Sequence, residues 1–251
     1  MITIIPCKEE PKEKKDKFIY VANQGEDDSM CKKLNRGIEI ALRKYKDDII
    51  CIRHDDSEIR TPIDVVEWQL HEQFKDKKIG VVGVIGCACL YDSCVWWTPN
   101  RQINGLGAIY QGGVRQKTVN GIKWVDENDK PIMEKFEYPM VEHVGVLDYA
   151  ATLDGCCMFF PRRIFEGGLR YDEWLPDYHF YDADICCTIL SEGYKVGINT
   201  NIEVYHESRG EMPEHFDKLR VNFYNKWNAR IDAWPISRLT KFKRIENGRI
   251  I

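Results

Sequence analysis

Short apolar runs alternate with one long helical pattern in the first fifty residues. The runs at 2–5 and 18–21 have the length of strands, and the charged segment 8–17 between them is typical of a solvated loop. From 29 to 45, apolar residues recur at the spacing of one helix face, and a further strand follows at 49–52. This strand–helix–strand order predicts a parallel sheet with a crossover helix, whose ligand site lies beyond the carboxyl ends of the strands.

The next part of the chain predicts more sheet and then a change of character. Thr61-Pro62 opens a helix, with Pro62 in the first turn, where its missing N–H does no harm. Residues 79–85 form a continuous apolar run, which is typical of a strand buried on both faces. From 91 to 146, glycines and hairpin-like turns such as Asn120-Gly121 indicate an antiparallel insertion.

Beyond the insertion, apolar runs and helical stretches return. We expect a strand at 156–160, a helix beginning near Pro161, and helices at 185–190 and 216–227. The fold class expected for residues 1–230 is therefore α/β, with a mostly parallel central sheet flanked by helices.

Composition narrows the classes of function. The 251 residues suffice for one substantial core followed by a C-terminal tail at 231–251, which is basic from Thr240 onward. With 43% hydrophobic and 30% charged residues and a net charge of -4, the chain has no general attraction to nucleic acid or to anionic membranes. No apolar run approaches the roughly 20 residues that cross a bilayer, and no signal-type segment opens the chain, so we expect a soluble, cytoplasmic protein.

The ten cysteines admit three interpretations: disulfides, metal ligands or core packing. Cys156-Cys157 and Cys186-Cys187 are adjacent pairs, and no Cys-x-x-Cys spacing occurs. In a cytoplasmic protein we expect these residues to be reduced and mostly structural, since free cysteine packs as a small buried hydrophobe.

Clustered polar side chains end the strand predicted at 49–52. His54, Asp55 and Asp56 follow that strand and offer ligands to a divalent cation, which as a hard acid prefers oxygen. Asp-Asp-Ser is also common chemistry for a turn, so these side chains could simply cap the turn that follows. Judged alone, the segment leaves both interpretations open.

A second acidic pair precedes a predicted helix. Asp182 and Asp184 could cap that helix, since the helix dipole favours carboxylates there, or one of them could act as a general base on an acceptor hydroxyl. His206, at the end of an apolar strand, is either a metal ligand or a histidine satisfied by a neighbour. Trp96 and Trp97 are either core residues or a stacking wall for a sugar ring.

The order of these motifs resembles that of the GT-A nucleotide-sugar glycosyltransferases, especially family-2-like members whose metal segment contains His, any residue, Asp. The resemblance covers most of residues 1–230 and rests on these segments: His54-Asp55-Asp56, 80–86, Trp96-Trp97, Asp154-Gly155, Tyr171-Asp172-Glu173, 180–184, 193–196, 205–208 and Lys226-Trp227. It implies a GT-A-like (Rossmann-like) fold and a metal-dependent transfer of a sugar from a nucleotide diphosphate sugar to an acceptor hydroxyl. The cofactor implied is Mn²⁺ or Mg²⁺.

The resemblance also implies roles for single residues. Asp56 corresponds to the last Asp of the metal-binding motif, and His206 corresponds to a late histidine that completes metal binding. Asp182 corresponds to the catalytic Asp, a general base in an inverting displacement, with Tyr181 in place of the usual Glu. Contact with the donor or the acceptor is implied for the remaining candidates: His54, Asp55, Trp96, Trp97, Asp154, Gly155 and Asp184.

Two other classes of protein compete with this interpretation. A nucleotidyltransferase is disfavoured because no Gly-rich, basic triphosphate loop lies near the N-terminus. A catalytically weak carbohydrate-binding or scaffold protein that retains the fold is favoured by two departures from relatives. These are Tyr181 and the linker 8–17, which is too short and polar for the packed helix that relatives place there. The expected partners are a nucleotide diphosphate sugar and a glycan or other hydroxyl-bearing acceptor, whereas nucleic acid is not expected.

Overall fold

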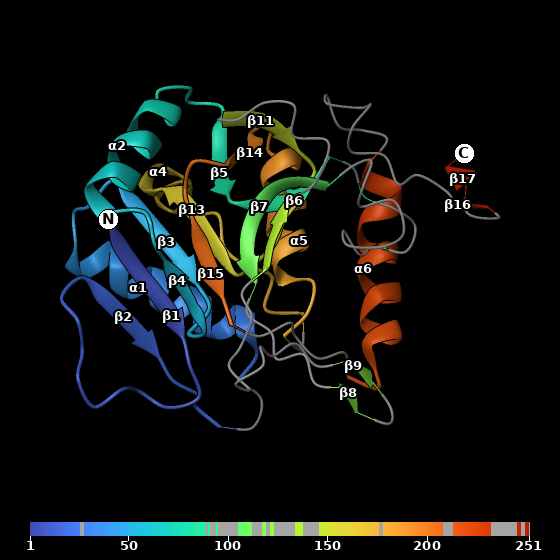
Figure 1. The fold of residues 1–251 in the computed structure, drawn as a ribbon, viewed down its shortest axis with the longest axis horizontal. Helices are drawn as coiled ribbons and strands as arrows, with labels where there is room; N and C mark the ends of the chain where they lie inside the picture. Colours follow the sequence, from blue (N-terminus) through green and yellow to red (C-terminus); the bar gives the residue numbers. More distant parts are fainter. Residues whose placement is uncertain are drawn as a thin grey trace.

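The computed structural model of the chain contains two principal sheets with helices around them (Figure 1). It describes residues 1–25, 28–88, 90, 94, 105–111, 117–118, 121–122, 134–137, 146–175, 178–207, 213–231, 245–246 and 249–250.

The central sheet has seven strands in the described residues, and five of them run in the same direction. Strands β3, β1 and β2 are parallel neighbours, as are β5 and β14, whereas β13 and β11 run against them. The mostly parallel sheet predicted from the sequence is therefore confirmed. Its order is β11 (Val146–Ala150), β14 (Lys195–Asn199), β5 (Ile79–Gly83), β13 (Cys157–Pro161), β3 (Ile49–Arg53), β1 (Ile2–Pro6) and β2 (Phe18–Val21).

Helix α1 (Met30–Lys44) connects β2 to β3 and confirms the predicted crossover. Its N-terminus is capped by Ser29, whose hydroxyl oxygen accepts a hydrogen bond from the backbone N–H of Lys32 at 3.3 Å. Leu34, Ile38 and Ala41 recur at helical spacing and are fully buried in the core beside β1 and β2.

The connection between β1 and β2 also follows the prediction. The two strands are parallel neighbours, yet residues 7–17, all of which the structure describes, link them without a helix. The shortened N-terminal region expected from the charged linker is thus present.

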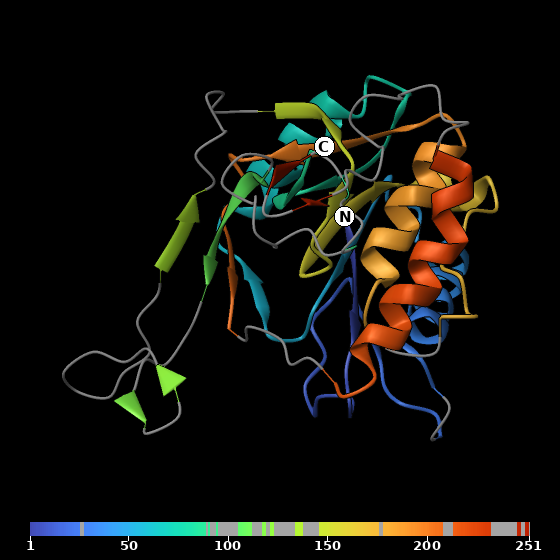
Figure 2. The same ribbon diagram turned by 90° about the vertical axis from the view of Figure 1, so that its right-hand side faces the viewer.

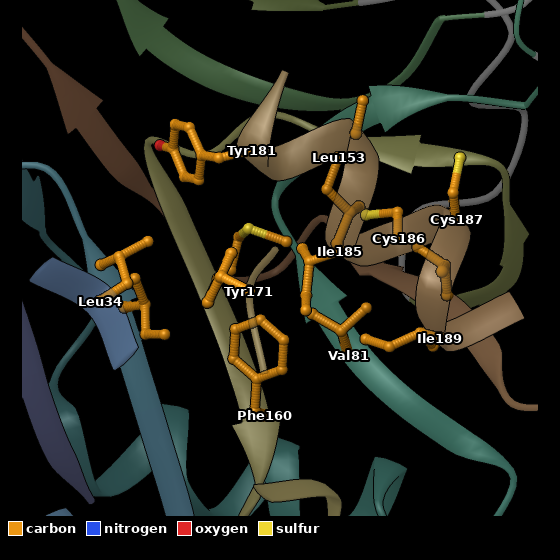
Figure 3. Close-up of a cluster of buried hydrophobic side chains, with 14 of the residues drawn as sticks. Leu34, Val81, Leu153, Phe160, Tyr171, Tyr181, Ile185, Cys186, Cys187 and Ile189 are labelled. Atoms are coloured by element: carbon orange, nitrogen blue, oxygen red, sulfur yellow. The ribbon is translucent and has the colours of Figure 1, made fainter. Parts of the chain in front are cut away.

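The central sheet lies between two layers. One face is covered by α1, α4 (Arg162–Glu166), α5 (Tyr181–Ser191) and α6 (Phe216–Ile231), of which α5 and α6 run side by side (Figure 1 and Figure 2). Figure 3 shows part of this core, where Tyr171 lies between Phe160 of β13 and Tyr181 of α5. The other face is covered by α2 (Ile63–Gln73), through Val66 and Leu70, and by the second sheet.

The single strand predicted at 79–85 is wrong, because the structure has two strands there, β5 and β6 (Ile85–Cys87). The apolar run divides at Val84, whose carbonyl accepts a hydrogen bond at 2.9 Å from Ala108 of the second sheet. Both halves are buried, so the apolar composition gave no sign of the break. The second sheet has the order β12 (Thr152–Leu153), β6 (Ile85–Cys87), β7 (Gly105–Gln111), β15 (Val204–His206) and β4 (Ser57–Ile59), with β10 (Glu134–Glu137) beside β7.

The predicted insertion is mostly antiparallel in the residues that the structure describes, although β7 pairs in parallel with β15. Strand β10 pairs antiparallel with β7, and β8 (Lys117–Thr118) pairs antiparallel with β9 (Gly121–Ile122). Of the predicted Asn120-Gly121 turn, Gly121 opens β9 and Asn120 lies outside the described residues. The helix expected at 216–227 is confirmed as α6. In the tail, β16 (Ile245–Glu246) pairs with β17 (Arg249–Ile250), and the domain boundary at residue 230 stays a prediction.

Two further expectations concern the whole described chain. All nine described cysteines are buried and form no disulfides with one another. Among the described residues, no helix combines the length and the apolar character that a membrane span requires.

Candidate metal and catalytic site

The turn after β3 carries the first candidate residues from the central sheet to the second sheet. The carbonyl of Cys156, next to β13, accepts hydrogen bonds from the His54 backbone N–H at 3.1 Å and from the Ser57 hydroxyl at 2.8 Å. Strand β4 then pairs with β15, with Ser57 opposite His206, and the Glu207 N–H donates to the Asp56 carbonyl at 2.9 Å. Backbone hydrogen bonds therefore bring residues 54–56 and His206, far apart in the sequence, to one place.

Three side chains converge there. His54 Nδ1 lies 3.2 Å from His206 Nε2, and Asp56 Oδ1 lies 3.4 Å from His206 Nε2 and 3.8 Å from His54 Nδ1. Among the described residues, His54, Asp56 and His206 are the group of His, Cys, Asp and Glu side chains with the spacing to hold a metal ion. The two metal candidates, Asp56 and His206, are thus brought together, and His54, expected to contact the donor, joins them.

The geometry of this group fits a divalent cation. The three separations place the point equidistant from the three atoms about 2.0 Å from each, which matches metal–imidazole and metal–carboxylate distances. His54 and His206 are only 9% and 7% exposed, whereas Asp56 is partly open to solvent. A cation bound here would keep one side open to a substrate.

The protonation of the two histidines differs. Burial lowers the pKa of His54 below its usual value, and the neighbouring His206 lowers it further, so the neutral ring is favoured. Burial also acts to lower the pKa of His206, but its hydrogen bond to Asp56 and the charge of Asp154 outweigh burial and leave that pKa raised. A neutral imidazole is the form that binds metal, so the lowered pKa of His54 favours that form, whereas the raised pKa of His206 opposes it.

Helix α5 brings the second acidic segment to the same place. It begins at Tyr181, earlier than the predicted 185–190, so that Asp182 and Asp184 both lie in its first turn. The residue before it, Phe180, has a left-handed backbone with φ of 65°. Tyr181 extends its hydroxyl to 2.6 Å from His54 Nε2. The sequence marks Tyr181 only as a departure from relatives and contains no signal for this contact between residues 127 apart.

Asp182 is held by backbone amides beside the Asp154-Gly155 turn. Its Oδ2 accepts a hydrogen bond from the Gly155 N–H at 3.0 Å, and its Oδ1 accepts one from the Ala183 N–H at 2.8 Å. Loss of hydration, aided by the charge of Asp154, raises the pKa of Asp182 to about 7 in spite of these hydrogen bonds. A carboxyl group with that pKa can take up a proton near neutral pH.

The remaining candidates are distributed differently. Asp55 is exposed in the turn, and Asp154 accepts a hydrogen bond from the Cys156 N–H at 2.8 Å. Asp184 is buried and bonds to α6 instead, with Lys226 Nζ and Trp227 Nε1 each 2.6 Å from its Oδ1. Trp96 and Trp97 lie outside the described residues.

A further aromatic residue borders the site. Tyr178 is 42% exposed, and its ring centroid lies 5.8 Å from that of His54. Burial of its hydroxyl raises the pKa of Tyr178, and the charges of Asp56, Asp154 and Asp182 add to this effect. The sequence gave no reason to separate Tyr178 from the aromatic stretch around it.

Comparisons with known proteins give the family and the fold of the chain. A family model described as "Glycosyltransferase like family" matches residues 9–227, which is most of the chain. A search of curated protein sequences finds no match.

Among solved structures, a crystal structure of GalNAc-T7 with UDP, GalNAc and Mn²⁺ resembles the chain with a TM-score of 0.53 and 13% sequence identity. The match covers 85% of this chain and 37% of that one, so the chain spans well under half of its structural neighbour. The crystal structure of A197 from STIV matches with a TM-score of 0.43 and 10% identity, over 83% of this chain and 86% of that one. The first of these likenesses shows a shared fold.

Proposed function

Because the chain belongs to a glycosyltransferase-like family and has a GT-A-like fold, we propose that it transfers a sugar from a nucleotide diphosphate sugar to an acceptor hydroxyl, with a divalent metal ion as cofactor. The observation that carries this proposal is the convergence of His54 Nδ1, Asp56 Oδ1 and His206 Nε2 on one point. Tyr181 at the start of α5 contacts His54, and Asp182 is the next residue of that helix. The presence of UDP, GalNAc and Mn²⁺ in GalNAc-T7, which shares the fold, supports a donor of that chemical class.

His54, Asp56 and His206 would bind Mn²⁺ better than Mg²⁺. Two imidazoles and one carboxylate form a mixed nitrogen and oxygen set, which favours Mn²⁺ over Mg²⁺, since Mg²⁺ prefers oxygen alone. When bound, the cation would supply positive charge to offset the negative charge that develops on the departing diphosphate. Asp56 is the anionic member of the set, and its removal would weaken the binding of cation and donor together.

Asp182 would act as the general base. Its carboxylate takes the proton of the acceptor hydroxyl while the hydroxyl oxygen attacks the anomeric carbon opposite the leaving diphosphate, which inverts that carbon. The Gly155 N–H fixes the orientation of the Asp182 carboxylate. The pKa of Asp182, about 7, leaves much of this group ionised at neutral pH. Contact of Asp55, Asp154, Asp184, Trp96 and Trp97 with the donor or the acceptor stays a prediction.

The experiment that tests this proposal is thermal unfolding with a panel of nucleotide diphosphates and their sugars, with and without Mn²⁺. We expect one nucleotide to raise the melting temperature only when Mn²⁺ is present, because a ligand that binds only the folded state stabilises it. Asp56→Ala should lose that increase, whereas Glu58→Ala, which removes an exposed carboxylate of β4, should keep it. The nucleotide identified in this way names the donor to use in a transfer assay.

Two results would contradict the proposal. One is the absence of a metal-dependent shift with every nucleotide in protein shown to be folded. The other is sugar binding that persists without metal or nucleotide, which would favour a carbohydrate-binding or scaffold role for the same fold.

A further inference from the structure

We propose that Tyr181 is a positioning residue that holds His54 as a metal ligand through its Nδ1 atom. This inference rests on the proposed metal site and names the residue that fixes its geometry.

The first step concerns the two nitrogens of His54. Nδ1 faces His206 Nε2 at 3.2 Å and Asp56 Oδ1 at 3.8 Å, whereas Nε2 faces the Tyr181 hydroxyl at 2.6 Å. Nδ1 can bind a cation only through its lone pair, so the proton of the neutral ring must be on Nε2. Nε2 then donates to the tyrosine oxygen, and this hydrogen bond sets both the tautomer and the ring orientation. Partners of this kind on the second nitrogen of a ligating histidine are a general feature of metal sites.

The second step concerns how closely Tyr181 is fitted. A Cβ atom added to Gly155 would lie 2.0 Å from the tyrosine hydroxyl and 2.5 Å from its Cζ. The ring therefore passes directly over the backbone of the Asp154-Gly155 turn on its way to His54. Any side chain at position 155 would displace the hydroxyl, so glycine at that position is a condition for the contact.

The third step compares Tyr181 with another tyrosine of the same core. Tyr171 is also a buried tyrosine, and its ring centroid is 6.1 Å from that of Tyr181 (Figure 3). The Tyr171 hydroxyl has no hydrogen-bond partner among the described residues, so its ring serves packing alone. Packing in the same core does not by itself bring a hydroxyl to a ligand, and Tyr171 provides a matched control.

The test measures Mn²⁺ affinity in the metal-free full chain by titration, with free Mn²⁺ followed by electron paramagnetic resonance. Tyr181→Phe keeps the ring and removes only the hydroxyl, and we expect it to weaken Mn²⁺ binding roughly 10- to 100-fold. Tyr171→Phe should leave the affinity at the wild-type value. The melting temperature of each variant without metal shows whether the fold is retained.

A second readout separates positioning from packing. In the metal-free wild-type protein, nitrogen-15 NMR of the histidine rings should show the His54 proton on Nε2. We expect Tyr181→Phe to shift this ring toward a mixture of tautomers, and we expect Tyr171→Phe to leave it unchanged.

The outcomes distinguish this inference from the proposed function. Wild-type affinity and tautomer in Tyr181→Phe would overturn the role of Tyr181 and leave the metal site intact. A wild-type protein that binds no Mn²⁺ would overturn the metal site and this inference with it. A loss of affinity in both phenylalanine variants would show that the effect comes from the core and would also overturn the inference.

Discussion

At the scale of single residues, Asp182 is the side chain whose substitution tests catalysis most directly. Asp182→Asn keeps the size of the side chain and an oxygen for the Gly155 N–H but cannot take up a proton. We expect turnover to fall about 10²- to 10⁴-fold, the usual contribution of a general base, while Mn²⁺ affinity stays at the wild-type value. Steady-state kinetics with the identified donor measure the loss. Near-wild-type turnover in this variant would reject Asp182 as the base.

Mn²⁺ binding should depend on pH through His206. Because its pKa is raised above the usual value, His206 carries a proton in the metal-free protein at pH values where an ordinary histidine would be neutral, and the cation must displace that proton. Affinity should therefore increase as pH rises, by up to about tenfold per pH unit below the pKa of His206, and should level off above it. Calorimetry in buffers of different ionisation enthalpy measures the proton release. An affinity that is the same at acidic and alkaline pH, with no proton released, would contradict the prediction.

At the scale of the elements, α5 and α6 are joined by a buried charge. Asp184 in the first turn of α5 is 1% exposed and is satisfied by Lys226 and Trp227 of α6, and Lys226 also bonds to Asp172 at 2.7 Å. Burial is the main influence that raises the pKa of Asp184, and the charge of Lys226 opposes it. The carboxylate therefore depends on α6 for its partner.

Lys226→Met should leave the Asp184 carboxylate without its cationic partner while keeping the apolar part of the side chain at position 226. We expect a loss of about 3 kcal/mol in the free energy of unfolding, since breaking a buried pair leaves one charge uncompensated. Lys75→Met is the control, because the exposed pair of Lys75 with Glu72 should contribute less than about 1 kcal/mol. Urea unfolding monitored by circular dichroism measures both variants. Equal losses in the two variants would show that the Asp184 pair is no stronger than a surface pair.

The elements also show how far the sequence could predict the fold and the site. Periodicity predicted α1, α6 and the buried strands, because each has a face whose apolar spacing is local. The break at Val84 was missed because both halves of its run are buried, in two different sheets. The resemblance of motifs implies metal binding by Asp56 and His206, catalysis by Asp182 and donor contact by His54. In the structure His54 lies with Asp56 and His206, and the roles of all four residues stay predictions. The contact of His54 with Tyr181 depends on packing between segments that are distant in the sequence, and a local sequence pattern cannot predict such packing.

At the scale of the whole molecule, the metal group connects the two sheets. His54 follows β3 of the central sheet, whereas His206 ends β15 of the second sheet, so a bound cation would tie both sheets to one point. Metal binding should therefore stabilise the folded chain as a unit, rather than a single loop.

We expect Mn²⁺ at about 100 times its dissociation constant to stabilise the wild-type protein by about 2.7 kcal/mol. For a chain of this size, that corresponds to an increase of roughly 5–10 °C in the melting temperature. His206→Ala should show no increase at the same concentration, because the second sheet then supplies no ligand. Differential scanning calorimetry measures the shift, and a shift of wild-type size in His206→Ala would place the cation elsewhere.

Helix α6 supports the site indirectly, through the left-handed backbone of Phe180. For a residue other than glycine this conformation costs on the order of 1–3 kcal/mol, and it directs the chain into Tyr181 and Asp182. The Phe180 ring stacks on Phe223 of α6 with centroids 5.3 Å apart, which anchors the strained residue. A shortened protein that ends before Phe216 would lose this anchor together with the partners of Asp184. A fragment that keeps Tyr181 and Asp182 in their positions must therefore include α6, although no residue of α6 belongs to the metal group.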